Sequence, residues 1–304
     1  MANPPSAEPG PADSVAFLVF AHSDPVHVRR LTSALAPFPV YLHCDRRTSD
    51  ETLAEMSQGI PTDRIIEPRE ECKWAQWGLV AAEVTALRQA LATSTAEHFV
   101  VMTGSDYPLA PTREIAEFLA GYPGRSVARY RPMPLPNWGS SGGLARIRYR
   151  HYGWRKQMIR IPVPRSIPEG IVPSGGSHQK ILSRGHAEKI VAVHDNRPDL
   201  VRFWRRSWSA DETFMPTILL SPEFGIDWPA ESVDGQAWWI GWNGTRMKTP
   251  PVLTGEHFDR LREGRFPSGG AVVPKLFARK FSTNVSADVL DRIDDELRSL
   301  AGAR

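Results

Sequence analysis

The chain has 304 residues, of which 41% are hydrophobic and 23% charged, and its formal net charge is +3. A chain of this length can bury a full hydrophobic core, as one large α/β domain or two fused halves. The mild positive charge suits a small anionic ligand but does not by itself indicate a nucleic-acid-binding protein. No apolar run approaches the roughly 20 residues that a membrane-spanning helix needs, and two cysteines provide no disulfide framework. We therefore expect a cytoplasmic protein with no membrane span.

Residues 1–13 are rich in Pro, Ala and Gly and contain no apolar run, so we expect them to form a disordered tail. The rest, residues 14–304, is expected to be a single domain. Its first half, residues 14–123, has the pattern of a nucleotide-binding layer. Its second half, residues 124–304, is expected to provide the acceptor and catalytic groups.

Apolar strands alternate with amphipathic helices over the first 120 residues. The expected strands are Val15–Phe20, Pro39–His43, a segment near Arg64–Glu67, and His98–Thr103. The expected helices begin after Ser23 or Asp24, cover Gly78–Ala92, and begin again at a capping Thr112. This alternation predicts an α/β fold with a doubly wound, mostly parallel sheet. In such sheets ligands bind beyond the carboxyl ends of the strands, so Asp45 and Asp106 should face one crevice.

The pattern is less regular in the second half. From Gly124 to Pro173 we expect an ordered but irregular insert on the acceptor side, which includes the basic and aromatic run Arg146–Lys156. Regular structure should resume at Gly175–Ser183. The remaining expected elements are a helix from Arg184 to Trp204, the segments Ser209–Leu219, Ala237–Trp242 and Leu276–Phe281, and a final helix over Ala287–Leu300.

Seven segments in this order resemble glycosyltransferase family 14, in its bacterial-type form. This family contains the core-2/I-branching N-acetylglucosaminyltransferases and the peptide O-xylosyltransferases. The segments are FLVFAHSDPVHVRRL, YLHCDRR, the Trp-containing entry to the Gly78 helix, FVVMTGSDYPLAPTREIAEFL, GSHQKILSR, SADETFMPTIL and LFARKFS.

The resemblance implies a modified GT-A fold and inverting transfer of a sugar from a UDP-sugar to a hydroxyl of a glycan or small-molecule acceptor. N-acetylglucosamine is the first expectation for the donor sugar, and xylose or another sugar on the same fold is the alternative. A sugar- or nucleotide-binding protein that has lost catalysis is a second alternative.

The resemblance also implies that no divalent metal or other cofactor is required. The sequence supports this independently, because it contains no Asp-x-Asp, the motif with which most GT-A enzymes hold Mn²⁺ or Mg²⁺. The nearest acidic run is Asp294-Asp295-Glu296 in the expected terminal helix. A solvated helix face is the simpler interpretation of that run.

Glu212 corresponds to the catalytic glutamate of the family, which takes the proton from the attacking hydroxyl. Locally, Ser209 and Glu212 also have the spacing of a helix capping box, so a purely structural role is the alternative. Asp211 is the neighbouring carboxylate, which we also assign to the acceptor side.

Lys280 corresponds to the family's lysine at the donor diphosphate, and Arg246 or Lys248 is expected to supply a second cation. The alternative is that Lys280 is an ordinary surface charge, although Phe277 and Phe281 flank it.

Further donor contacts are expected at the ends of the strands. The family resemblance places His22, His43, Asp45, Arg46 and Asp106 there. Asp106 has two possible roles, which are contact with the sugar and support of its own turn. The other residues could also have a purely structural role.

The expected acceptor residues come from the second half of the chain. They are Ser177, His178, Asp211, Trp239 and Trp242. The two tryptophans could stack on a sugar ring or belong to the core. Nucleic-acid binding through Arg146–Lys156 is a third class of function, and the near-neutral remainder of the chain argues against it.

Overall fold

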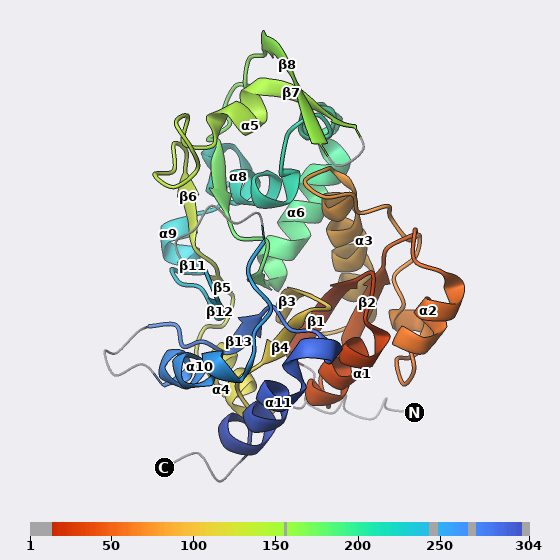
Figure 1. Cartoon of the computed structure of the whole chain (residues 1–304). Helices are drawn as coiled ribbons and strands as arrows, with labels where there is room; N and C mark the ends of the chain where they lie inside the picture. The colour runs from red at the N-terminus through yellow and green to blue at the C-terminus, as the bar shows by residue number, and fades with distance from the viewer. Residues whose placement is uncertain (1–13, 155–156, 243–248, 267–271, 300–304) are drawn as a thin grey trace, which may run out of the picture.

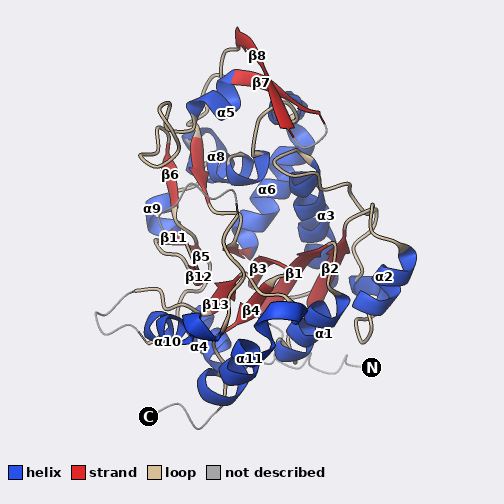
Figure 2. Cartoon of the chain, viewed as in Figure 1, coloured by secondary structure: helices blue, strands red, loops and turns tan. Residues whose placement is uncertain are grey.

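The computed structural model describes residues 14–154, 157–242, 249–266 and 272–299. The expected disordered tail, residues 1–13, lies outside these ranges. A six-stranded sheet is central to the described ranges (Figures 1 and 2). In spatial order its strands are β11 (Ser232–Val233), β5 (Ser126–Val127), β10 (Lys180–Ser183), β3 (His98–Thr103), β1 (Val15–Ala21) and β2 (Val40–Cys44). Only β10 runs antiparallel to its neighbours, so the sheet is mostly parallel, as predicted.

The strand β1 lies at the middle of the hydrophobic core and is buried on both faces. Val15, Phe17 and Val19 pack into one hydrophobic cluster, while Leu18 and Phe20 pack into another on the opposite face. Successive side chains of a strand point to opposite faces, so a strand covered on both sides must be apolar throughout. This explains the unbroken apolar run in the sequence.

Helices cover both faces of the sheet, which makes the fold doubly wound, as predicted (Figure 1). On one face lie α1 (Pro25–Ala34) and α11 (Thr283–Arg292), which contribute Val28 and Leu290 to the first cluster. On the other face lie α3 (Gly78–Thr93), α6 (Arg184–Asn196) and α8 (Phe214–Leu220), which contribute apolar side chains to the second cluster. Because β5 and β10 come from the second half of the chain, both halves share one sheet.

A second, three-stranded sheet brings a late segment of the chain to the end of β3. Its order is β12 (Trp238–Ile240), β13 (Phe277–Arg279) and β4 (Asp106–Pro108). Arg279 of β13 is paired in register with Asp106 of β4. The sequence indicated neither β4 nor this pairing, and it is this sheet that positions Lys280.

The insert of residues 124–173 is more regular than predicted. It contains α5 (Leu144–Arg148) and the hairpin of β7 (Tyr149–Trp154) and β8 (Gln157–Pro164), which form the upper end of the molecule in Figure 1. Another strand of the insert, β6 (Tyr130–Pro132), pairs with β9 (Ser174–Gly176).

Three further expectations were wrong in detail. The segment near Arg64–Glu67 is a short 3-10 turn, Thr62–Arg64, followed by a single bridge between Ile65 and Leu42 rather than a strand. Pro111, not Thr112, is the cap residue of α4 (Thr112–Ala120). The helix from Arg184 ends at Asn196, and α7 (Pro198–Trp204) follows it, because proline cannot donate the hydrogen bond that would continue a helix.

The terminal helix also begins earlier than predicted, at Thr283, and continues into a π-helical turn, Ile293–Leu297. The other helical elements are α2 (Asp50–Met56), α9 (Trp228–Glu231), α10 (Phe258–Arg265) and the 3-10 turns Ala210–Glu212, Pro222–Phe224 and Gly255–His257. Among the described residues, no helix has the length and apolar character needed to cross a membrane.

Candidate active site

Three parallel strands, β1, β2 and β3, end side by side at one edge of the central sheet. The backbone N–H of Asp45 donates to Ala21 O at 2.9 Å, and that of Gly104 donates to Phe20 O at 2.8 Å. A Cβ on Gly104 would lie 2.7 Å from the Cβ of Ala21, so this close approach of the two chain segments requires glycine. His22 and Asp45, which directly follow β1 and β2, therefore lie at the same edge, as predicted.

Asp45 is buried and held by Arg47. Arg47 donates to both carboxylate oxygens, at 3.0 and 2.8 Å, and the N–H of Cys72 donates at 3.1 Å. Burial alone would raise the pKa of Asp45, but the hydrogen bonds and charge of Arg47 lower it to about 2. The carboxylate is thus charged and fixed. By contrast, the predicted Arg46 is 65% exposed, and its guanidinium forms an ion pair with Glu71 at 3.7 Å.

His43 is fully buried rather than open to the sheet edge. Its Nε2 accepts a hydrogen bond from the backbone N–H of Glu70 at 2.9 Å, and burial lowers its pKa to about 4. The neutral ring fixes the loop that follows β2. This geometry favours the structural alternative for His43 over direct contact with a donor.

Asp106 is also fully buried, and each of its carboxylate oxygens has partners. One oxygen accepts from the Thr103 hydroxyl at 2.8 Å and from Arg279 at 2.9 Å, and the other accepts from Thr103 N at 3.0 Å and from Trp238 Nε1 at 3.2 Å. Of the two roles left open by the sequence, the structure favours support of the turn. It does so by tying β3 to the second sheet.

Lys280 follows β13 and lies near His22. Desolvation lowers the pKa of His22, and the nearby positive charges of Lys280, Arg47 and Arg279 lower it further, against the opposing effect of Asp45. Arg279 is occupied by Asp106, whereas no carboxylate in the described part of the chain lies within 4.0 Å of Lys280 Nζ. Lys280 is therefore a positive charge available to an anion at the sheet edge. The other two predicted cations, Arg246 and Lys248, lie outside the described residues.

Glu212 lies in a short 3-10 turn before α8. Ser209 has a left-handed backbone (φ 50°) and its side chain caps nothing, so the capping-box interpretation is wrong. The hydroxyl of Thr213 accepts from Trp204 Nε1 at 3.1 Å and donates to Ser209 O at 3.2 Å, which fixes the turn. The Glu212 carboxylate forms an ion pair with Arg146 of α5.

The surroundings of Glu212 raise its pKa to about 7. Burial is the largest cause, and the negative charge of Asp211 adds to it, while Arg146 opposes both. Burial likewise raises the pKa of Asp211, whose Oδ1 has no hydrogen-bond partner among the described residues. A carboxylate with a pKa near 7 is well matched to accepting a proton near neutral pH.

His178 belongs to a buried charged cluster that lies between the sheet edge and Glu212. The Glu83 carboxylate, on α3, lies 2.7 Å from Lys180 Nζ and 2.6 Å from His178 Nδ1. The His178 ring is 6.0 Å from that of Phe20, the residue at the end of β1. Burial would raise the pKa of Glu83, but Lys180 and His178 lower it. Glu83 was missed, although an acid beside Val84 on an apolar helix face was a signal for such a buried pair.

The remaining predicted acceptor residues differ in exposure. Ser177 is tied to its own turn by donating to Gln179 Oε1 at 2.9 Å. Trp239 is half-buried and packs against Arg260, whose guanidinium lies 5.5 Å from the ring. Trp242 is 50% exposed, so of the two tryptophans it has the open surface that stacking on a sugar would need.

Two other tryptophans lie beside the Glu212–Arg146 pair. The Arg146 guanidinium is 3.8 Å from the centre of the Trp138 ring and 5.3 Å from that of Trp208. Sequence reasoning missed both, as well as Arg146 as the partner of Glu212, because nothing local connects residues so far apart in the chain.

The described residues contain no group of three or more His, Cys, Asp or Glu side chains that could hold a metal ion. The acidic run Asp294-Asp295-Glu296 was expected to be a solvated helix face, and this expectation is wrong for Asp294. Asp294 accepts from Arg30 at 2.6 Å and from Tyr107 at 3.0 Å, and so anchors this helix to α1 and β4.

Comparison with known proteins identifies the family. Residues 15–262 match the sequence model of the Core-2/I-Branching enzyme family. The chain is similar to xylosyltransferase 2 of Rattus norvegicus, with 25% identity over 95% of this chain and 34% of the relative. Human xylosyltransferase 2 is 23% identical over the same shares, and human xylosyltransferase 1 is 22% identical over 84% of this chain and 27% of its own. The chain thus spans about a third of the length of these curated relatives.

The family match covers most of the chain and agrees with the mostly parallel, doubly wound sheet. It also includes the strand ends and the turn that carries Glu212. The chain therefore belongs to the Core-2/I-Branching enzyme family of glycosyltransferases.

Proposed function

We propose that the protein transfers a sugar from a UDP-sugar to an acceptor hydroxyl with inversion, and that Glu212 is the general base. The observation that carries the proposal is the position of the Glu212 carboxylate, which is 35% exposed and lies against Arg146; its pKa, raised to about 7 by burial and by Asp211, supports the same role. Its ion pair with Arg146 holds the carboxylate in place, while its exposure leaves it accessible to an acceptor.

The reaction needs no covalent intermediate. Glu212 takes the proton of the acceptor hydroxyl as the oxygen attacks the anomeric carbon on the face opposite the nucleotide. The new C–O bond forms as the bond from the anomeric carbon to the phosphate oxygen breaks. UDP leaves with that electron pair, and the configuration at carbon is inverted.

The departing diphosphate needs positive charge, and Lys280 is the described residue best placed to supply it. It is half-buried, lies near His22 at the sheet edge, and has no acidic partner in the described ranges. A preorganised charge in a partly water-excluded site stabilises a developing anion more than the same charge in water. Arg46, together with Arg246 or Lys248, is proposed to complete the site without a metal.

The sugar of the donor is a separate question. The relatives named xylosyltransferase favour UDP-xylose as the first donor to test, ahead of UDP-N-acetylglucosamine, which the sequence segments suggested.

A thermal-shift panel of UDP-sugars tests the donor proposal. A ligand at 100 times its Kd stabilises the folded state by about 2.7 kcal/mol, which gives a measurable rise in Tm. UDP-xylose, UDP-N-acetylglucosamine and UDP should raise the Tm, whereas ADP-glucose serves as the control. If no uridine nucleotide raises the Tm, the donor proposal is wrong.

The substitution Glu212→Gln tests the base. It should lower kcat by about 10²–10⁴ while leaving the Kd for the UDP-sugar nearly unchanged, because only proton transfer is lost. Hydrolysis of the UDP-sugar by water provides an assay before the acceptor is known. Unchanged turnover in the variant would show that Glu212 is not the general base. Donor binding without turnover in the wild type, with any acceptor, would instead indicate a binding protein that has lost catalysis.

A further inference from the structure

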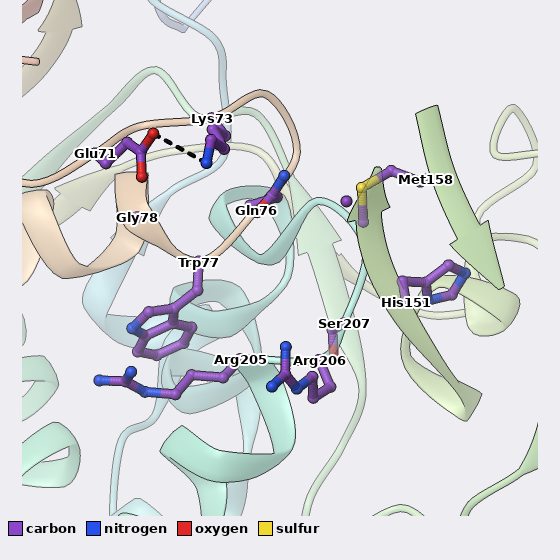
Figure 3. A pocket seen from close by; sticks show the side chains of 11 residues that line it. Glu71, Lys73, Gln76, Trp77, Gly78, His151, Met158, Arg205, Arg206 and Ser207 are labelled. Atoms are coloured by element: carbon purple, nitrogen blue, oxygen red, sulfur yellow. Dashed lines mark ion pairs between the residues drawn. The ribbon is translucent and has the colours of Figure 1, made fainter. Parts of the chain in front are cut away.

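Two cavities with shared lining residues lie beside the β7–β8 hairpin, and neither Glu212 nor Lys280 lines them. Their volumes are about 140 and 510 Å³, the second within the usual range for ligand pockets. Both are lined by Trp77, Arg205 and Arg206. Figure 3 shows the smaller cavity, with Arg205 extended along the Trp77 ring. We name the two cavities together the arginine groove.

The arginines of this groove are not neutralised. Arg150, Arg202, Arg205 and Arg206 line the larger cavity and are exposed, and in the described ranges none of them has a carboxylate within 4.0 Å. The acidic residue that lines the smaller cavity, Glu71, is paired with Lys73 at 3.0 Å. Elsewhere in the described part of the chain most exposed arginines have an acidic partner, so four unpaired arginines around one hollow form a concentrated positive surface. Unpaired guanidinium groups repel one another, and an anion that binds between them relieves the repulsion.

Contacts with aromatic rings and backbone hold the groove in shape. The Arg206 guanidinium lies 4.6 Å from the Tyr152 ring, and that of Arg205 lies 5.8 Å from Trp77. Half-buried Arg165, directly after β8, donates to Phe203 O and to the Ser207 hydroxyl, both at 2.7 Å, which ties the end of β8 to the end of α7. Burial, with the charge of Arg150 added, lowers the pKa of Arg165 to about 10, in keeping with the positive surroundings.

The groove is connected to the candidate active site through two ring contacts. Trp208 lies 5.3 Å from the guanidinium of Arg146, the partner of Glu212, and 6.0 Å from the ring of His151, which lines the groove. The backbone joins the same parts, since Trp208 N donates to Arg146 O at 2.9 Å and His151 N donates to Arg206 O at 2.8 Å. The groove and the Glu212–Arg146 pair are thus neighbours, with Trp208 between them.

We propose that the arginine groove binds the acidic part of the acceptor, an oligosaccharide whose sugar units carry carboxylate groups. The inference rests on the proposed function, since it takes the acceptor to be extended beyond Glu212. A planar guanidinium group binds a carboxylate through two parallel hydrogen bonds. The four arginines would bind carboxylates on successive sugar units of the acceptor.

The geometry favours an acidic glycan over two other anionic partners. Single-stranded nucleic acid needs open aromatic faces for its bases, but Trp77, which lines both cavities, is only 8% exposed. The Tyr152 ring is 40% exposed but has the Arg206 guanidinium 4.6 Å from its centre, and the more exposed Trp154 lines neither cavity. A membrane surface is flat, whereas these arginines surround a cavity. A flat layer of lipid headgroups would not reach into it.

Direct binding of a short oligogalacturonate, measured by calorimetry at low and at physiological salt, tests the proposal. The test variant is Arg202→Gln with Arg205→Gln and Arg206→Gln, all at exposed positions. The matched control removes three exposed arginines from the opposite end of the molecule in Figure 1, by Arg113→Gln, Arg262→Gln and Arg292→Gln in α4, α10 and α11. A neutral malto-oligosaccharide, a single-stranded oligonucleotide and vesicles of an anionic phospholipid are the comparison ligands.

The wild type and the control variant should bind oligogalacturonate, more weakly as salt rises, and the groove variant should bind at least about tenfold more weakly. The proposal is overturned if the wild type does not bind, if both variants lose affinity equally, or if the neutral sugar, oligonucleotide or vesicles bind as tightly. Binding of UDP-sugars is measured in parallel on every variant. If UDP-sugars bind and oligogalacturonate does not, only the groove proposal fails. If oligogalacturonate binds and no UDP-sugar does, the proposed function fails, and the groove is a glycan-binding site that serves no transfer reaction.

Discussion

Glu212 and Asp211 are adjacent carboxylates in very different surroundings. Glu212 is paired with Arg146 and partly exposed, whereas Asp211 carries a buried oxygen with no described partner. Burial raises the pKa of both; the negative charge of Glu83 adds to the rise at Asp211, and that of Asp211 adds to the rise at Glu212. We interpret Glu212 as the group that contacts the acceptor and Asp211 as a positioning residue that acts through it.

The pH dependence of turnover should change when Asp211 is neutralised. The negative charge of Asp211 contributes to the pKa of about 7 at Glu212, so Asp211→Asn should lower that pKa. In the wild type kcat should rise with pH through about 7 as Glu212 loses its proton. In the variant the rise should occur at lower pH, with a similar plateau. A pH–rate profile that keeps its midpoint would show that Asp211 does not influence the base.

The neighbouring cations Arg279 and Lys280 should have separable roles. Lys280→Gln should lower kcat/KM for the donor by about 10²–10³, the scale found when one preorganised donor to a developing anion is lost, with little change in Tm. Arg279→Gln should instead lower Tm, because it leaves the fully buried Asp106 without its charged partner. Steady-state kinetics and thermal unfolding of both variants provide the check. The assignment is wrong if Lys280→Gln acts only on Tm.

At the scale of elements, the loop after β2 depends on a neutral histidine. The buried His43 ring accepts a hydrogen bond from Glu70, and its pKa is lowered from 6.5 to about 4. The unfolded chain therefore binds more protons than the folded one between these values. The contribution of His43 to stability is fully present above pH 6.5 and is lost as the pH falls toward 4.

Unfolding by urea at two pH values tests this. His43→Gln keeps an acceptor but cannot titrate, so its stability should depend less on pH. Between pH 7 and pH 5 the wild type should lose about 2 kcal/mol more unfolding free energy than the variant. Equal losses would mean that His43 is not held neutral by the fold.

The elements that the sequence could predict are those with a local signal. The apolar run of β1 and the spacing of α3 depend on periodicity within one segment, and both formed as expected. The segment near Arg64–Glu67 has only a short apolar stretch, and its backbone makes one bridge. The second sheet was not predictable, because it pairs Asp106 with Arg279, which no local pattern connects.

The candidate site divides in the same way. Glu212 and Lys280 could be proposed from the sequence because they lie in recognisable segments, whereas Arg146 and Glu83 join the candidate site only through tertiary contacts. His43 and Asp106 have the residue types of ligand-binding groups, but the structure buries both. The burial of these side chains depends on other segments that pack over the strand ends. The sequence of the strand itself does not predict those segments.

At the scale of the whole molecule, two of the positively charged regions that the structure describes have different proposed partners. One is the sheet edge with His22 and Lys280, and the other is the arginine groove beside β7. Only the first would face the diphosphate. The chain contains no Asp-x-Asp to hold a cation beside that diphosphate, so protein side chains must balance its charge if the proposed reaction is correct.

Turnover should therefore not depend on a divalent metal. UDP-sugar hydrolysis or transfer by protein treated with EDTA should proceed at the rate of untreated protein, and added Mn²⁺ or Mg²⁺ should not raise it. Lys280→Gln provides the informative comparison, because a metal can partly replace a missing side-chain charge at a phosphate. Mn²⁺ should then restore some activity to the variant alone. Loss of wild-type activity in EDTA, regained with Mn²⁺, would mean that a metal rather than Lys280 carries the leaving-group charge.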